Sequence, residues 1–186
     1  MKKENQGVQE GKLRLITAGE IAMAKRVYGN AITWSRVWIH YDSYLPFGLQ
    51  NKFTAMAPNG EIWFREPFYR ADYSVPQVDT LLKHTFIHEL AHVWQHEHGM
   101  WVRMRGLFSW AADYHYRLDR STLVEYSLEQ QASIIADYWL LIVKGFGEWN
   151  FQRQNIPGRF CKYRGLDRPQ DLIGLYEKII YGRKRS

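Results

Sequence analysis

The chain has 186 residues, a length typical of one domain, and its 46% hydrophobic and 16% aromatic content excludes a disordered protein. A single cysteine, Cys161, excludes an internal disulfide framework and a four-cysteine zinc finger. The net charge is +6, but much of the excess lies near the two ends, so we expect solvated tails and no nucleic-acid partner. No segment approaches the roughly 20 apolar residues of a membrane span, and no signal peptide is evident, so we expect synthesis as a soluble cytoplasmic protein.

The first half of the chain is expected to contain one helix and a small sheet. Thr17 and Glu20 match a capping box, in which a hydroxyl and a carboxylate satisfy the free amides of a helix start, and they predict a helix over residues 18–28. Aromatic and β-branched residues within 32–41 and 55–64 predict strands. This sheet would precede the main helix in sequence.

Two long helices are expected in the middle of the chain. Pro76 suits the first turn of a helix, and no strong breaker follows before Gly99, so one helix is predicted over 76–97. Ser127 and Gln130 form a second capping box, which predicts a helix over about 128–143.

The end of the chain is expected to hold a long loop over 145–165 and a last helix from about residue 168 that stops at Gly182. The domain organisation follows from these elements. We expect a flexible leader over 1–13, one domain over 14–181 and a basic tail over 182–186.

The informative motif is His88-Glu89-Leu90-Ala91-His92, which lies in the middle of the predicted helix 76–97. Residues four apart are one turn apart on nearly the same side of a helix, so the two imidazoles can bind one Zn²⁺ ion. In zincins, the zinc peptidases that carry this HExxH motif, the glutamate takes a proton from the zinc-activated water and later gives it to the leaving amine. The spacing therefore predicts two metal ligands, His88 and His92, and one general base, Glu89.

The neighbours of the motif sharpen this prediction. They leave the helix apolar almost all round, so the three polar side chains are expected to be at least partly buried. A buried carboxylate beside two imidazoles is costly unless a divalent cation balances the charge. The other interpretation is a solvated helix face whose polar residues fit the motif by chance.

A catalytic zinc usually has a third protein ligand. His98 has the spacing of the third histidine of metzincins, but that pattern needs a glycine at position 95, where this chain has Gln95. If the helix continues, neither His96 nor His98 can reach the same ion. We expect both to be exposed histidines at the helix end, where they favour the helix dipole.

Glu129 is the best candidate for the third ligand, because it lies in the first turn of the helix that Ser127 caps. A carboxylate there can face the motif helix, although it can also simply complement the helix dipole. Glu125 is the reserve candidate, and it is weaker because it precedes the cap.

Several further roles are weaker hypotheses. Asp137 can orient a ligand histidine or be a surface residue. Tyr114, His115 or Tyr116 can donate a hydrogen bond to the oxyanion of a reacting carbonyl. Residues 61–64, if they form an edge strand, can pair with a substrate backbone or simply close the sheet.

With these motifs in hand, the chain resembles the zincin-like effector domains attached to VgrG and Rhs proteins of bacterial type VI secretion systems. The resemblance rests on segments spread over most of the chain: Leu15–Ala22, Leu45–Phe47, Pro58–Ile62, His88–Gln95 and Leu128–Ala132. It implies an α+β, helix-rich fold with a small sheet, of the Glu-type zincin class. It also implies His88, His92 and Glu129 as zinc ligands and a catalytic Glu89. The chain lacks any VgrG or Rhs portion, so it is either an excised domain or a free-standing effector.

The function that follows is a zinc metallopeptidase that cleaves a peptide or protein substrate. The resemblance further implies delivery by type VI machinery into the periplasm of a rival bacterium, and an immunity protein. Two other readings compete with this one. The first is a SprT-like protease that works near DNA, favoured by the basic ends but lacking an evident zinc ribbon. The second is a zinc-stabilised binding module without catalysis, which would not need Glu89.

Overall fold

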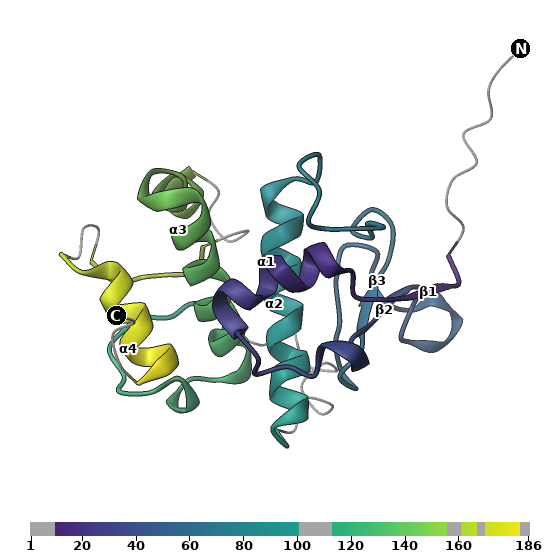
Figure 1. Ribbon diagram of the computed structural model, residues 1–186, viewed down its shortest axis with the longest axis horizontal. Coiled ribbons are helices and arrows are strands. Elements are labelled where there is room, and N and C mark those ends of the chain that lie inside the picture. The colour runs from purple at the N-terminus through teal and green to yellow at the C-terminus, as the bar shows by residue number, and fades with distance from the viewer. Residues whose placement is uncertain (1–9, 101–112, 156–160, 167–169, 183–186) are drawn as a thin grey trace, which may run out of the picture.

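The computed structural model describes residues 10–100, 113–155, 161–166 and 170–182, and within them the fold is α+β (Figure 1). A small sheet lies on one side of the long central helix α2, and helices α3 and α4 lie on the other side, while α1 crosses α2. Residues 1–9 of the expected leader over 1–13 and residues 183–186 of the expected basic tail over 182–186 lie outside the described residues.

The sheet contains strands β1 (Lys12–Leu15), β2 (Trp38–Tyr41) and β3 (Ile62–Phe64) in that order. β1 runs antiparallel to β2, and β2 runs parallel to β3. β2 and β3 lie where strands were expected. β1 was not expected, and it begins inside the segment assigned to the leader. Its four residues alternate polar and apolar side chains, but the stretch is short and both leucines are exposed, so it gives only a weak strand signal.

Helix α1 (Ala18–Tyr28) has the predicted bounds and the predicted capping box between Thr17 and Glu20. Helix α2 (Thr80–Glu97) starts four residues later than expected, because the side chain of Asp79, and not the turn at Pro76, caps its first amides.

Helix α3 (Leu128–Asn155) has the predicted cap, in which Ser127 and Gln130 exchange side-chain hydrogen bonds. It continues past Gly145, which has a positive φ of 82° and kinks the helix without ending it. The expected loop over 145–165 is therefore wrong for residues 146–155. Helix α4 (Leu172–Tyr181) ends at the left-handed Gly182, as predicted.

Short 3-10 helices connect these elements at Trp34–Arg36, Pro46–Gly48 and Leu123–Glu125. The core lies where α2 packs against α3 and β3, and its largest buried side chains include Trp139, Tyr73 and Phe86. In the parts of the chain that the structure describes, no helix has the length and hydropathy needed to span a membrane.

A buried carboxylate joins the sheet to α1. Glu20 is 0% exposed, and its two oxygens accept hydrogen bonds from the Arg14 guanidinium at 2.7 and 2.8 Å and from the amides of Thr17 and Tyr73, each at 2.8 Å. Arg14 also donates to the Arg70 carbonyl at 2.9 Å. One side chain therefore satisfies donors from three separate segments.

We expect Glu20→Ala to lower the free energy of unfolding by about 3–5 kcal/mol, because it leaves a partly buried guanidinium and two amides without their acceptor. Urea unfolding followed by circular dichroism measures the change. Glu97→Ala, which removes an exposed carboxylate that accepts from the Thr33 amide, is the matched control and should cost far less. Equal losses in the two variants would contradict this account of Glu20.

Candidate metal centre

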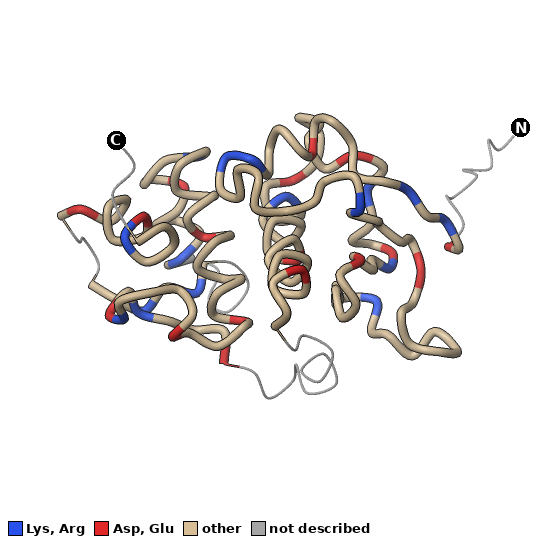
Figure 2. The backbone as a smooth tube through the Cα atoms, turned by 60° about the horizontal axis from the view of Figure 1, so that its bottom comes forward, with Lys and Arg blue, Asp and Glu red and all other residues tan. Residues whose placement is uncertain are grey.

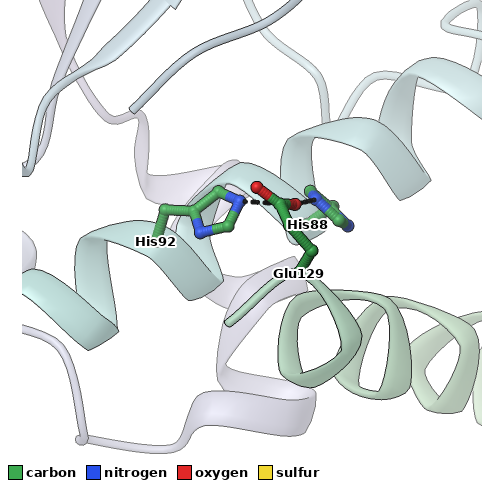
Figure 3. Close-up of side chains that lie close together, drawn as sticks. All are labelled: His88, His92 and Glu129. Carbon is green, nitrogen blue, oxygen red and sulfur yellow. Dashed lines mark hydrogen bonds and ion pairs between the residues drawn. The ribbon is translucent and has the colours of Figure 1, made fainter. Parts of the chain in front are cut away.

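Three side chains that the sequence singled out converge on one point between α2 and α3 (Figure 3). His88 and His92 lie one turn apart on α2, and Glu129 reaches them from the first turn of α3. The Oε2 atom of Glu129 is 3.3 Å from the Nε2 atoms of both histidines. One ligand atom from each residue lies within 4.8 Å of the other two.

These separations suit a bound cation better than direct hydrogen bonds. A charge-assisted N–H···O bond is usually about 2.7–2.9 Å long, so the 3.3 Å contacts are loose for that purpose. Ligands at about 2.0–2.1 Å from a tetrahedral zinc ion lie about 3.3 Å from one another. The nitrogen and oxygen atoms are also the donor types that zinc takes, so the residues fit this ion.

Within the cluster, the histidines and Glu129 shift one another's pKa values. Burial acts to lower the pKa of His92, but the Glu129 carboxylate outweighs it and raises that pKa to about 9. Burial acts to raise the pKa of Glu129, but the charges of His92 and His88 and their hydrogen bonds hold it well below its ordinary value. His92 and Glu129 thus stabilise each other's charged forms, and a cation bound between them would compete with a proton on His92.

Glu89 lies beside the ligands and is almost fully buried, at 6% exposure. Burial raises its pKa above the ordinary value, and the charges of His92 and His88 only partly oppose this. None of the described residues hydrogen-bonds to its Oε2 atom, which is rare for a buried carboxylate. Glu89 also lines the cavity together with His88. Its Oε2 atom therefore lies at the candidate site and has no hydrogen-bond partner among the described residues.

The orientation of His92 is fixed by a residue whose role the sequence analysis missed. Gln95 is fully buried, and its Oε1 atom accepts from Nδ1 of His92 at 2.8 Å. Its Nε2 atom donates to the Leu128 carbonyl at 2.9 Å and to Oε1 of Gln131 at 3.1 Å. Because the amide nitrogen already donates twice, Nδ1 of His92 carries the hydrogen, and Nε2 is directed to the cluster. The signal in the sequence was a glutamine three residues after a ligand.

The structure separates the alternative ligands from the cluster. His96 and His98 are exposed at the end of α2, as predicted, and Nδ1 of His98 contacts the Trp94 carbonyl at 2.8 Å. Glu125 is exposed and caps a 3-10 helix through Thr122. The choice of Glu129 over Glu125 therefore agrees with the geometry.

A cavity of about 610 Å³ opens beside the cluster and is lined by His88, Glu89 and Tyr114 among others. The centre of the Tyr114 ring lies 6.1 Å from that of His88. Of the three oxyanion candidates, His115 is exposed, and the Tyr116 hydroxyl donates to a buried carboxylate. Tyr114 is therefore the one that the fold places next to the predicted ligands.

Asp137 does not orient a ligand histidine, and it is not a surface residue. It is 0% exposed, and its Oδ1 atom lies 2.8 Å from Nε2 of His84, one turn before His88 on α2. Its Oδ2 atom accepts from the Tyr116 hydroxyl and from the Lys162 amide, both at 2.8 Å. The hydrogen bond between Asp137 and His84 therefore connects α3 to α2 at the same interface, one turn before His88 on α2.

The segment 61–64 does form an edge of the sheet, but this edge is covered at Trp63. The Met56 amide donates to the Trp63 carbonyl at 3.1 Å, and the Trp63 amide donates back at 2.7 Å. The hypothesis that this strand itself pairs with a substrate is therefore wrong at its central residue. The residues just before Met56, Thr54 and Ala55, line the cavity instead.

Comparisons with known proteins place the chain among secreted effector domains. No protein-family model matches the chain. The type VI secretion system spike protein VgrG2b of Pseudomonas aeruginosa is 40% identical over 135 residues, and the match covers 68% of this chain. The chain spans only 13% of the length of that spike protein.

The effector domain of Pseudomonas aeruginosa VgrG2b, a solved structure, superimposes on the chain with a TM-score of 0.62 and 34% identity. The match covers 87% of this chain and 90% of that domain. The resemblance to VgrG-attached effector domains is confirmed, while the peptidase chemistry stays a prediction. Because the similarity extends over nearly the whole solved domain, the chain belongs to the family of the VgrG2b effector domain of type VI secretion.

Proposed function

We propose that this domain is a zinc-dependent metallopeptidase of the Glu-type zincin class. The observation that carries the proposal is the cluster of His88, His92 and Glu129, in which Oε2 of Glu129 lies 3.3 Å from Nε2 of each histidine, with the buried and unpartnered Oε2 atom of Glu89 beside it. A structural zinc site needs only ligands. A carboxylate held next to the ligands without a partner supports hydrolysis over a purely structural role.

The residues of the site have different roles in the proposed hydrolysis of a peptide bond. Zinc held by His88, His92 and Glu129 would supply Lewis acidity toward the substrate carbonyl and the attacking water. Glu89 accepts a proton on its unpartnered oxygen and later donates it to the leaving amine, a role that its raised pKa favours. Tyr114 lines the same cavity and is our candidate for the hydrogen-bond donor to the oxyanion.

Membership of the VgrG2b effector-domain family supports a role as a type VI secretion effector. We propose that the domain is delivered by type VI machinery into a rival cell and acts there on a peptide or protein substrate. An immunity protein that protects the producing cell is part of this proposal. The chain spans only 13% of the length of the spike protein VgrG2b, so the delivery route is a part of this proposal.

The rival readings receive less support from the structure. A DNA-associated protease would be favoured by a basic face, but along the described chain Lys and Arg are interspersed with Asp and Glu (Figure 2). A binding module without catalysis leaves the buried Oε2 atom of Glu89 without a purpose. The peptidase reading accounts for that atom.

Zinc content tests the ligand set. Glu129→Ala should lower zinc affinity by more than about 100-fold, because it removes one of three protein donors. Glu125→Ala is the matched control, since that carboxylate is exposed and should not affect binding. Both affinities are measured by competition with a chromogenic chelator. Retention of tight binding by Glu129→Ala would refute the third ligand.

Peptide or casein cleavage tests the role of Glu89. Glu89→Gln should retain about one zinc per chain and lose about 10²–10⁴-fold in kcat, because the amide cannot accept the proton. Glu97→Gln, which neutralises an exposed carboxylate on the same helix, should cleave at the wild-type rate. Wild-type turnover by Glu89→Gln would exclude the proposed chemistry.

The contact between Gln95 and His92 gives a third test. Gln95→Leu should weaken zinc binding by about 10–100-fold while the fold persists, because His92 loses the acceptor that fixes its tautomer. Gln152→Leu is the control, because it changes a buried glutamine on α3 whose amide donates to Glu148, more than twenty residues after Glu129. The same chelator assay, with urea unfolding as a check on stability, measures both. Unchanged zinc affinity in Gln95→Leu would show that the contact is incidental.

A further inference from the structure

The cavity beside the metal cluster has a polar floor and an apolar mouth. Ser133 and His84, at 1% and 6% exposure, lie at the floor together with Glu89. The mouth is formed by apolar side chains that are partly buried or exposed: Phe53, Ala55, Phe68 and Leu81. A substrate therefore meets an apolar surface on its way to the residues proposed for catalysis.

Phe53 is the most exposed of these side chains, with 72% of its surface accessible to solvent. Its ring contacts the ring of Phe68 edge to face, with the two centroids 6.5 Å apart and the planes at 82°. Phe68 packs against the core, so this partner is fixed while most of the Phe53 ring faces solvent. An aromatic side chain buries about 150–250 Å² when it is covered, so a ligand that covers Phe53 gains apolar contact that the fold does not use.

The backbone around Phe53 is held in place, so its ring is presented at a fixed position. Gln50 is 2% exposed, and its Nε2 atom donates to the Thr54 carbonyl at 2.8 Å and to the Trp63 carbonyl at 3.2 Å. The Phe53 amide donates to Oδ1 of Asn51 at 2.8 Å. These bonds connect the segment to β3, and a preorganised side chain loses less conformational entropy on binding than a mobile one.

The apolar mouth lies within a few substrate residues of the metal cluster. Leu81, Thr85 and His88 are four and three residues apart, so they share one side of α2, and all three line the cavity. At about 1.5 Å per residue, Leu81 lies about 10 Å along the helix from His88. An extended peptide spans about 3.3–3.6 Å per residue, so a side chain at the mouth belongs to a residue roughly one to three positions from the scissile bond.

The charged groups that line the cavity either belong to the proposed reaction centre or interact with other residues of the protein. Glu89 belongs to the reaction centre, and Nε2 of His84 lies 2.8 Å from Oδ1 of Asp137. The Lys162 ammonium lies 5.8 Å from the centre of the Tyr114 ring and also interacts with the charge of Asp137. These groups give no reason to expect a charged side chain on the substrate at the mouth.

We infer that the substrate carries a large apolar side chain close to the scissile bond, and that Phe53 and Phe68 bind it at the mouth of the cavity. The inference rests on the proposed peptidase function and names the class of its substrate: peptides with an aromatic or large aliphatic residue near the bond that is cut. A substrate ring there packs against two rings that already meet edge to face, a geometry that aromatic groups favour. Phe53 is the specificity-determining residue, because its ring is the exposed one of the pair.

The test measures binding separately from turnover. The zinc-loaded Glu89→Gln variant is titrated by calorimetry with short acetylated, amidated peptides of alanine and serine that carry one internal Phe, Ala or Gln, with its position varied along the peptide. We expect the best Phe peptide to bind about 10- to 50-fold more tightly than its Ala partner, because its ring is removed from water. The Gln peptide, of similar length but polar, should bind no better than the Ala peptide.

Phe53→Ser, added to Glu89→Gln, should reduce the preference for Phe over Ala by about three- to tenfold. This variant should fold, because the lost ring is mostly exposed and the backbone hydrogen bond of residue 53 is kept. Phe47→Ser is the matched control: its ring is 97% exposed in the same segment of chain and is not among the described residues that line the cavity. It should keep the full preference, and circular dichroism checks the fold of both variants.

The inference is overturned if no Phe peptide binds better than its Ala partner, if the Gln peptide binds as tightly as the Phe peptide, or if the preference is unchanged in Phe53→Ser. Absence of binding by every peptide at millimolar concentration overturns it as well. Failure of the proposed function has a different signature. In that case the preference for Phe is present and depends on Phe53, but wild-type protein with its zinc cleaves none of the peptides.

Discussion

The interface between α2 and α3 holds two imidazoles and two carboxylates out of water, and the rest of the site depends on this burial. Charged groups without solvent are costly unless opposite charges or a cation compensate them. Glu129 compensates the histidines only loosely, at 3.3 Å, and Glu89 has an oxygen with no partner among the described residues. Such an arrangement is expected where a cation and a substrate complete the site, and it is hard to explain as a means of stabilising the fold.

Elements governed by local geometry were predicted well from the sequence. His88 and His92 share one side of a helix because they are four residues apart, and this holds wherever the helix packs. Glu129 could be placed because the Ser127 and Gln130 cap fixes the start of α3 to the residue. The predicted ligand set thus followed from one helical period and one capping box, although only the fold shows that the two helices meet at these turns.

Features that depend on tertiary contacts were not predicted. β1 has few buried residues and forms only because β2 offers it a pairing edge, and Gly145 bends α3 where a glycine was taken as an end. Gln95 and Asp137 gain their roles from partners more than thirty residues away in sequence or across the helix interface. Asp137 has no local signature, and the spacing of Gln95 three residues after His92 becomes informative only once the packing of α2 on α3 shows the partners of its amide nitrogen, Leu128 and Gln131.

The antiparallel packing of α2 and α3 places two polar contacts at different levels of one interface. The turn that carries Glu129 faces the ligand histidines, and two turns later Asp137 holds His84 and the Lys162 backbone. The two levels use different side chains: His88 and Glu129 meet at one, and His84 and Asp137 meet at the other. Because both levels belong to the same helix pair, the packing that brings the candidate ligands together also fixes the buried Asp137 and His84 pair two turns away.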